Sequence, residues 1–448
     1  MKKTTGQLAD RRSFLRSGAG LLGAGIWADS TLDGAVQNTQ RNSSPSALRI
    51  TDLRVAVLAR APFTCPIIRI DTNQGISGYG EVRDGASKTF ALFLKSRILN
   101  ENPCNIEKIF RKLRQFGAHG RQAGGVVAIE MALWDLVGKA YSVPVWQMLG
   151  GKYRDRVRCY CDTPDSRDPK EFGERMKRRI QEHGFTWLKM DIGLQMLRNT
   201  PGTLSRPTQM EFSREHTLTG VELTDKGCAM MADYLSQVRE TVGWEIPIST
   251  DHFGRMGENS IIKLARAFEK CNLAWMEDTI PWYRTEQLKR ITAAVEVPIC
   301  TGEDIYLKQP FEVLCREHAV DVIQPDLSTS GGILETKRIG DMAQEYGIPM
   351  AMHMAGSPVA NFANVHCAAA TEGFLVLENH SVDIPWWDSL VDGVEKPILN
   401  KGYVKVPDGP GLGVTLNEEA MKQHLLEPGY FEPTPEWNKE RSADWIYS

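Results

Sequence analysis

Three carboxylates at equal spacing are the feature that most constrains this chain. Asp251, Glu277 and Glu303 each follow a short apolar run, and neighbouring acids in this series are 26 residues apart. One strand, one helix and two loops fit in such a step, so the acids are expected at the same end of adjacent parallel strands. Acids gathered there repel one another unless a hard divalent cation, most simply Mg²⁺, neutralises them. Acids at strand ends also serve as helix N-caps, but three in equal register favour a metal site.

The composition is that of a globular enzyme that acts on small molecules. The 448 residues are 42% hydrophobic and 24% charged, a balance that suits one large or two moderate domains. A net charge of −3 gives no reason to expect nucleic acid or an anionic membrane as a partner. The nine cysteines are scattered along the chain, so neither a disulfide framework nor a cysteine-rich zinc site is expected.

The N-terminus departs from this globular pattern. Arg11-Arg12 precedes a small apolar run ending at Ala28, which is too short and too rich in glycine for a permanent membrane span. The segment resembles a twin-arginine export signal, and a basic start followed by a disordered tail is the alternative. We expect residues 1–28 to be the signal and residues 29–47 to be a linker. The mature protein is then expected to be periplasmic or otherwise exported, without a membrane partner.

Residues 48–150 are expected to form an α+β capping domain. Alternation and β-branched residues from Leu48 to Asp71, and again before Glu81, predict an antiparallel meander with tight turns. Apolar residues then recur at helical spacing, which predicts helices over 89–99, 106–116 and 126–141. The last helix ends before Pro144, where the domain closes.

Residues 151–390 are predicted to form a (β/α)8-type barrel. Short apolar runs alternate with amphipathic helical patterns, and the candidate strands end near Cys161, Asp191, Asp251, Glu277, Glu303, Asp326, His353 and Glu378. Eight such ends are what this fold requires, and barrel active sites lie at the carboxyl ends of the strands. The interval from Asp191 to Asp251 is too long for one unit, so residues 194–221 are expected to be a loop inserted over the site. Residues 391–448 should pack on the capping domain, with a strand near 402–406 returning to it.

Two further strand ends supply an acid and an imidazole. Asp326 and His353 are 27 residues apart, which places them on adjacent strands. A carboxylate beside a histidine can hold the ring in the tautomer that leaves the other nitrogen free as a base. Either residue alone would be read as a satisfied core group. Their coincidence beside the three acids favours a catalytic dyad.

The second and eighth strands carry additional candidates. Lys189 and Asp191 share one face of their strand, because strand side chains alternate with period two. The lysine is expected to stabilise an anion or to move protons, and an ion pair with Asp191 is the alternative. Glu378 could, when protonated, donate a hydrogen bond to developing oxyanion charge, with a cap or loop contact as the alternative.

From about residue 50 to about residue 415 the chain resembles the enolase superfamily. Within it, the chain is most similar to the mandelate racemase subgroup and to acid-sugar dehydratases of the galactonate dehydratase type. The residues that carry the resemblance are the three strand-end acids, Gly75–Glu81, Ala132–Lys139, Pro144–Gly151, Gln324–Ser328 with Gly331-Gly332, and His353 with Pro358. These motifs are specific for the superfamily and much less so for the substrate.

The resemblance implies a magnesium enzyme with a carboxylate substrate. It implies Mg²⁺ on the three strand-end acids, a base dyad of His353 and Asp326, and an oxyanion-side role for Glu378. It also implies substrate contacts from loops of the capping domain and a symmetric homo-oligomer. The candidate substrate-binding residues are Asp191, Arg255, His119 and Arg121.

Two departures from the family pattern narrow the reaction. Racemases of the subgroup carry a second lysine as the base for the opposite face of the substrate carbon, and this chain has Asp191 there. One-base chemistry, such as β-elimination of water, is therefore favoured. Galactonate-dehydratase-like proteins place their leaving-group acid two residues after the strand-end aspartate, whereas His252 directly follows Asp251. This shift turns the ring away from the cavity if the strand continues, although a loop could return it, and His353 is the alternative acid.

The sequence thus predicts an exported, Mg²⁺-dependent lyase. It would remove the α-proton of a small hydroxy-carboxylate, with a sugar acid as the expected substrate, and eliminate water to give a 2-keto-3-deoxy acid. A racemase or epimerase acting on a carboxylate is one alternative. An exported, non-catalytic binding protein on an enolase scaffold is another, although a pure binder would have no need of both the acids and the dyad.

Overall fold

Eight short strands from the middle of the chain close into a parallel barrel. They are β4 (Arg156–Cys161), β5 (Leu188–Asp191), β8 (Ile248–Asp251), β9 (Trp275–Glu277), β10 (Ile299–Thr301), β11 (Val322–Ile323), β12 (Met350–Met352) and β13 (Phe374–Asn379). Each strand pairs with the next, and β13 pairs with β4 to complete the ring. The predicted (β/α)8-type barrel is confirmed, and all eight strands end within three residues of the predicted positions.

The computed structural model describes residues 43–118, 120–197, 199–205, 222–254 and 256–439. The predicted export signal and most of the predicted linker lie outside these residues, as do the candidate binding residues His119 and Arg255. Within the described ranges, no helix is long and apolar enough to cross a membrane.

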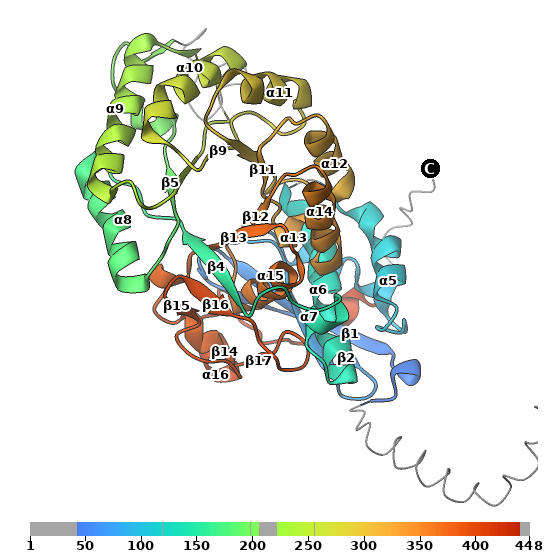
Figure 1. The fold of residues 1–448 in the computed structure, drawn as a ribbon. Helices are drawn as coiled ribbons and strands as arrows, with labels where there is room; N and C mark the ends of the chain where they lie inside the picture. Colours follow the sequence, from blue (N-terminus) through green and yellow to red (C-terminus); the bar gives the residue numbers. More distant parts are fainter. Residues whose placement is uncertain (1–42, 119, 198, 206–221, 255, 440–448) are drawn as a thin grey trace, which may run out of the picture. The chain divides into compact units, whose positions relative to one another are not determined.

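Helices surround the ring of strands, and Figure 1 shows them following one another around its outside. They are α8 (Pro169–His183), α9 (Asp225–Val242), α10 (Glu258–Phe268), α11 (Thr285–Ala294), α12 (Lys308–Arg316), α14 (Ile333–Glu345) and α15 (Pro358–Ala370). A short helix, α13 (Leu327–Ser330), follows β11. The predicted insertion at 194–221 contains a 3-10 turn, Leu194–Leu197, and the strand β6 (Leu204–Ser205), which pairs with β7 (Glu222–Leu223). Residues 206–221 lie outside the described ranges.

An apolar layer fills the barrel beneath its polar strand ends. Trp275 packs against Trp187 and Tyr160, with ring centroids 5.1 and 5.7 Å apart. Trp187 and Trp275 each precede a charged residue, Lys189 or Glu277, by two positions, so both members of a pair share the inward face. The interior is therefore a packed core, and the charged residues above it rest on a rigid floor.

The capping domain is built on a three-stranded antiparallel sheet, as predicted. Its strands are β1 (Ile50–Leu58), β2 (Cys65–Thr72) and β3 (Ser77–Glu81), and its helices are α3 (Thr89–Leu92), α4 (Lys95–Ile98), α5 (Ile106–Leu113) and α6 (Gly124–Tyr141), followed by α7 (Val145–Met148). The single helix expected over 89–99 is two short helices. The Leu94 N–H bonds to the Ala91 carbonyl, and this i→i+3 bond interrupts the α-helical pattern.

Two buried carboxylates join the capping domain to the barrel. Glu81, at the end of β3, accepts hydrogen bonds from the Ser357 and Ala360 amides at the start of α15, at 3.0 and 3.2 Å. Glu130 of α6 accepts the amides of Ile333 and Leu334 at the start of α14, at 2.8 and 3.2 Å. A carboxylate at a helix N-terminus satisfies unpaired N–H groups and interacts favourably with the helix dipole. Both contacts therefore fix the sheet of the capping domain against the barrel.

Glycines let β3 lie directly on α6. A Cβ added at Gly78 would collide with the Ala132 carbonyl, and one added at Gly80 would collide with the Ala128 carbonyl. The backbone of β3 therefore approaches the helix more closely than any side chain would allow. This approach sets where Glu81 and the residues that follow it enter the space above the barrel.

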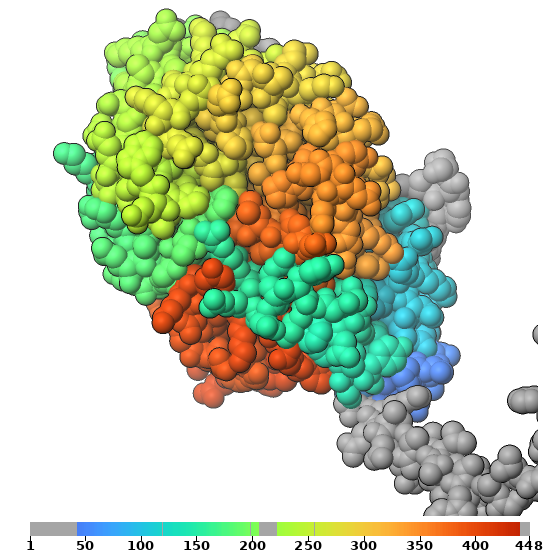
Figure 2. Space-filling model, viewed as in Figure 1, coloured from blue at the N-terminus to red at the C-terminus, as the bar shows by residue number. Residues whose placement is uncertain are grey.

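The C-terminal strand expected to return to the capping domain pairs with the barrel instead. β16 (Tyr403–Lys405) runs antiparallel to the first three residues of β4 and also pairs with β15 (Leu399–Asn400). The physical reason is strand length, because β4 begins well before its neighbour β5, which first meets it at Cys161, and the start of β4 therefore has backbone groups that β5 does not pair. In Figure 2 the red C-terminal segment covers the surface beside this part of the chain.

The remainder of the C-terminal segment contacts both parts of the fold. β14 (Val391–Asp392) pairs with β17 (Thr415–Leu416), and α16 (Glu418–Gln423) follows. Leu425 then pairs with Leu58 of β1, and the Thr434 hydroxyl donates to the Leu53 carbonyl. All nine cysteines are free thiols, most of them buried.

We predict that Gly80→Ala destabilises the protein, because the new methyl group must displace the α6 backbone. The expected loss in the free energy of unfolding is about 1–3 kcal/mol, measured by urea denaturation. Gly373→Ala is the matched control, since its Cβ would meet the flexible Gln344 side chain, whose nearest atom is 3.2 Å away. Equal stability of the two variants would contradict the close packing of β3 on α6.

Candidate active site

Lys189 is the centre of the charged layer at the carboxyl end of the barrel. Its Nζ lies 2.9 Å from Asp251 Oδ2, 2.9 Å from Glu277 Oε1 and 3.3 Å from Glu378 Oε1. Burial opposes the charge, but the three carboxylates, Asp251 first, raise the pKa of Lys189 well above its usual value. The alternative role, an ion pair of Lys189 with Asp191, is not among the close contacts of the ammonium. The ammonium instead neutralises acids from three other strands.

Glu277 lies deepest among the three expected metal ligands. Its second oxygen accepts the Trp275 indole N–H and the Gln324 amide, both at 3.0 Å. Burial, and then the charge of Asp251, raise the pKa of Glu277 well above its usual value. The neighbouring Asp278 has a pKa raised to about 8 by burial and by Glu303. Negative charge thus exceeds what Lys189 neutralises, which is the environment that attracts a cation.

The donor set fits a hard divalent cation. Asp251 and Glu277 end their strands and Glu303 lies two residues after the next one, and all three offer only carboxylate oxygens, the ligands that Mg²⁺ prefers. They do not yet converge, because Glu303 Oε2 lies 2.9 Å from His353 Nε2. Among the described residues, the group whose potential ligand atoms all lie within 4.8 Å of one another is Asp191, Asp251 and His252.

The structure brings the predicted dyad together. Asp326 and His353 form a parallel bridge, and His353 Nδ1 lies 2.6 Å from Asp326 Oδ2. The other carboxylate oxygen, Oδ1, accepts the Ser328 amide at 2.6 Å. Burial opposes the charge of His353, but Glu303 and Glu378 raise its pKa well above the usual value. His353 is therefore held between Asp326 on one nitrogen and the acids of the charged layer on the other.

His252 faces the site despite its one-residue shift. β8 ends at Asp251, and His252 has a φ of 79°, a left-handed conformation that breaks the alternation of the strand. Its Nδ1 lies 3.2 Å from Asp251 Oδ2 and 3.6 Å from Asp191 Oδ1. The hydrogen bond to Asp251 raises the pKa of His252 to about 10. The loop therefore returns the ring to the cavity as an imidazolium.

Two predicted roles meet a different environment in the structure. Glu378 was expected to be a protonated donor, but Lys189 and His353 outweigh burial and hold its pKa below the usual range, and its Oε2 accepts the Tyr160 hydroxyl at 2.9 Å. Arg121, a candidate substrate-binding residue, makes an ion pair with Asp84 at 3.1 Å within the capping domain, and its side chain remains partly exposed. Asp191 lies beside Asp251 across the strand pair, at the rim of the site.

Several residues of the site were not among those predicted from the sequence. Gln324, Tyr160 and His380 belong to the same barrel face as predicted residues, and the period-two rule could have found them, since Gln324 precedes Asp326 and His380 follows Glu378 by two. Arg83 comes from the capping domain. It makes an ion pair with Asp326 of the barrel. Local sequence patterns do not predict such a contact between distant segments.

A cavity of about 780 Å³ opens beside Asp191 and His252. Polar side chains from the insertion and from the loop before α8 are among the residues that line it, including Gln195, Asn199, Thr200 and Arg167. Such a lining suits a substrate that carries many hydroxyl groups.

Two family models match most of the chain. Residues 171–420 match the enolase C-terminal domain-like family, and residues 41–150 match the mandelate racemase/muconate lactonizing enzyme N-terminal domain. The chain belongs to the enolase superfamily. The resemblance predicted from its motifs is confirmed, and its two-part match follows the division between capping domain and barrel.

Relatives of this enolase-superfamily protein include sugar-acid dehydratases. D-xylonate dehydratase of Haloferax volcanii is 33% identical over 370 residues, covering 81% of this chain and 85% of that protein. A D-galactonate dehydratase family member of Streptomyces bingchenggensis is 28% identical over 419 residues, covering 90% and 100%. A solved mandelate racemase/muconate lactonizing enzyme-like protein of Rubrobacter xylanophilus has a TM-score of 0.75 at 30% identity, covering 86% and 99%.

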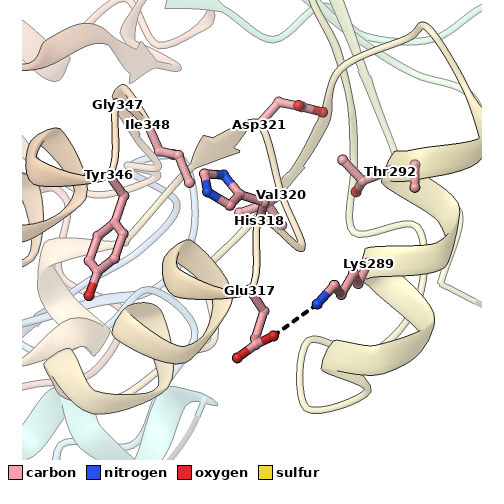
Figure 3. Close-up of a pocket in the computed structure, with 10 residues that line it drawn as sticks. Lys289, Thr292, Glu317, His318, Val320, Asp321, Tyr346, Gly347 and Ile348 are labelled. Carbon is pink, nitrogen blue, oxygen red and sulfur yellow. Dashed lines mark hydrogen bonds and ion pairs between the residues drawn. The ribbon is translucent and has the colours of Figure 1, made fainter.

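A second cavity, of about 530 Å³, lies at the other end of the strands (Figure 3). Asp321 and Ile348 stand just before β11 and β12, and Lys289 forms an ion pair with Glu317 at 2.9 Å. Active sites of barrel enzymes lie at the carboxyl ends of the strands, so this hollow is not the site of an enolase-superfamily enzyme.

We predict that Lys189→Met destabilises the protein in buffer free of divalent cations. Asp251, Glu277 and Glu378 lose their shared counter-charge, and the free energy of unfolding should fall by about 3 kcal/mol or more. The deficit should shrink as pH falls, because the unpaired carboxylates take up protons in the folded state.

Urea denaturation measures this loss, and Lys308→Met is the control. Lys308 pairs with Glu312 at 2.7 Å on the surface, so its removal should change stability by no more than about 0.5 kcal/mol. A Lys189→Met variant as stable as this control would show that the acids do not depend on the ammonium.

Proposed function

We propose that this protein is a Mg²⁺-dependent sugar-acid dehydratase. It would remove the α-proton of a 2-hydroxy acid and eliminate the 3-hydroxyl as water, giving an enol that becomes the 2-keto-3-deoxy acid. The observation that carries the proposal is the placement of one neutralisable base, the His353–Asp326 dyad, beside the acidic cluster, with an imidazolium at His252 on another strand. The names of the relatives supply the substrate class.

His353 is the proposed base. A proton on Nδ1, donated to Asp326, leaves Nε2 as the atom that accepts the α-proton. Nε2 faces Glu303 and Glu378, the side on which the carboxylate cluster lies. The proton therefore moves toward a ring whose cationic form is stabilised by neighbouring acids.

Negative charge that develops on the substrate needs cations close by. Lys189 supplies one ammonium, held in place by three carboxylates. Asp251, Glu277 and Glu303 would hold Mg²⁺, and the chemistry supplied there is Lewis-acid polarisation of the substrate carboxylate, which acidifies the α-hydrogen. Glu378, ionised and hydrogen-bonded to Tyr160, orients Lys189 in this scheme.

His252 is the proposed acid for the leaving hydroxyl. It has a raised pKa and is therefore protonated at neutral pH, and its ring borders the cavity with the polyhydroxyl-compatible lining. The hydroxyl that departs takes the imidazolium proton and leaves as water. Asp191 stands in the position where racemases of the subgroup have the lysine that acts as the second base, and its carboxylate instead keeps the His252 ring charged.

The first test is proton exchange in D₂O with Mg²⁺ and a panel of C5 and C6 sugar acids that includes D-xylonate and D-galactonate. We expect at least one of these acids to lose water and form a 2-keto-3-deoxy acid, and NMR would detect this product. Dialysis against EDTA should abolish turnover, and Mg²⁺ should restore it. Exchange with inversion and no loss of water would instead identify an epimerase, and tight binding without exchange would identify a binding protein.

Substitution of the base gives a sharper prediction. His353→Asn should abolish exchange of the α-proton, with a fall in rate of at least about 10³-fold, because the amide of asparagine cannot act as the base that the imidazole supplies. Binding of Mg²⁺, measured by calorimetry, should remain. Persistence of exchange would falsify the assignment of the base.

Separation of the two proton transfers tests the acid. His252→Gln should lower the rate of water loss by about 10²-fold or more while exchange of the α-proton with D₂O continues. The ratio of exchange to dehydration, measured by NMR on one sample, should therefore rise. An unchanged ratio would assign the leaving-group proton to His353.

We also propose that the protein is exported and forms a homo-oligomer. The twin arginines at 11 and 12 support export, and a folded passenger would keep its buried thiols from oxidation in the new compartment. Cell fractionation of the full chain, with the double substitution Arg11→Lys and Arg12→Lys as the comparison, tests the first statement. Light scattering on purified protein tests the second.

A further inference from the structure

Arg83 carries a guanidinium from the capping domain into the catalytic dyad. The residue follows β3 by two positions and is 1% exposed. Its Nη1 makes an ion pair with Asp326 Oδ2 and lies 3.2 Å from His353 Nδ1. These two partners stand 243 and 270 positions away along the sequence. One cation of the capping domain therefore touches both members of the base dyad.

The guanidinium is held by acids on every side. Its Nε lies 2.9 Å from Asp84 Oδ1, and its Nη2 lies 3.5 Å from Glu303 Oε1. Asp84 is in turn held by Arg121, whose Nη2 and Nε contact the Asp84 side chain and carbonyl at 3.1 and 2.8 Å. Burial of a guanidinium is costly unless it is paired in this way. A series of alternating charges thus runs from Arg121, at the surface of the capping domain, to the base.

We propose that Arg83 is a positioning residue that fixes Asp326, and through it the orientation and tautomer of His353, so that the base is complete only when the capping domain is seated on the barrel. The inference rests on the proposed function, because it concerns the same base. It assigns a catalytic dependence to a residue outside the barrel.

The contacts of Asp326 explain how this positioning works. Oδ1 is held by the Ser328 amide, whereas Oδ2 receives both His353 and Arg83. With the Ser328 hydrogen bond alone, the carboxylate could still rotate and move its second oxygen away from the imidazole. The guanidinium on Oδ2 prevents this rotation and keeps the oxygen directed at Nδ1. The proton of the ring therefore stays on Nδ1, and Nε2 remains the acceptor.

Arg83 acts through Asp326 and not on the substrate directly. Its nitrogen atoms are buried, with Nε and Nη2 free of hydrogen bonds and engaged in ion pairs only. On this side the guanidinium meets Glu303, which in turn contacts His353 Nε2. The role is therefore distinct from that of the carboxylate-binding arginine that an exposed guanidinium would supply.

The kinetic test uses Arg83→Met, which keeps the length of the side chain and removes its charge. We expect kcat to fall by about 10²-fold with little change in KM, since misplacement of a catalytic group slows the chemical step. The primary isotope effect of α-deuterated substrate should rise to its full value. Arg83→Lys should recover part of kcat, because an ammonium can still hold Asp326.

Arg97→Met is the matched control for a purely structural role. Arg97 is another buried arginine of the capping domain, and its guanidinium lies over the Phe93 and Phe116 rings, away from the dyad. Equal losses of kcat in the two arginine variants, with an unchanged isotope effect, would overturn the proposal. A rise in KM with kcat preserved would overturn it as well, because it would make Arg83 a substrate anchor.

A measurement without substrate separates this inference from the proposed function. The ¹⁵N spectrum of the histidine side chains, with His353 assigned from His353→Asn, reports which ring nitrogen carries the proton in the full-length protein. Arg83→Met should shift the His353 nitrogen signals toward a mixture of tautomers, and Arg97→Met should leave them unchanged. Unchanged His353 signals in a folded Arg83→Met or Arg83→Lys variant would refute the positioning role, whether or not any sugar acid is turned over.

Discussion

The contact of one ammonium with three buried carboxylates is the interaction on which the rest of the site depends. Lys189 stands at the centre of the barrel mouth and draws Asp251, Glu277 and Glu378 from three different strands to one point. Burial makes each of these charges expensive alone, so the cluster is stable only as a set. The excess of negative charge that remains is what a divalent cation would neutralise, and Asp251 also keeps the neighbouring His252 imidazole protonated.

The arrangement around this cluster is asymmetric, and the asymmetry has chemical meaning. His353 is buried, tied to Asp326 and enclosed by acids, whereas His252 lies at the rim beside the cavity. A buried base and a rim acid suit two successive proton transfers at neighbouring carbon atoms of one chain. Asp191, which pairs with His252, occupies the position where a lysine would supply a second base for the opposite face, and this arrangement favours elimination over inversion.

The barrel and most of its charged residues could be predicted because they obey local rules. The equal spacing of Asp251, Glu277 and Glu303 reflects one strand and one helix between neighbouring acids. The alternation of side chains along a strand places Lys189 on the inward face. The direction of His252 could not be predicted, since it depends on a positive φ at a single residue. Arg83 and the pairing of β16 with β4 escaped prediction for a different reason. Both depend on how segments distant in sequence come together, and neither contact produces a periodic pattern in the sequence.

The active site also depends on the glycines of β3, which carry no functional group. Gly78 and Gly80 let the strand lie against α6, and that depth determines how far Glu81 and Arg83 reach over the barrel. In a random mutagenesis screen scored by turnover, positions 78 and 80 would therefore rank with the catalytic residues although they bear no side chain. Efforts to transplant this active site onto another capping domain would have to copy that backbone spacing before copying any functional group.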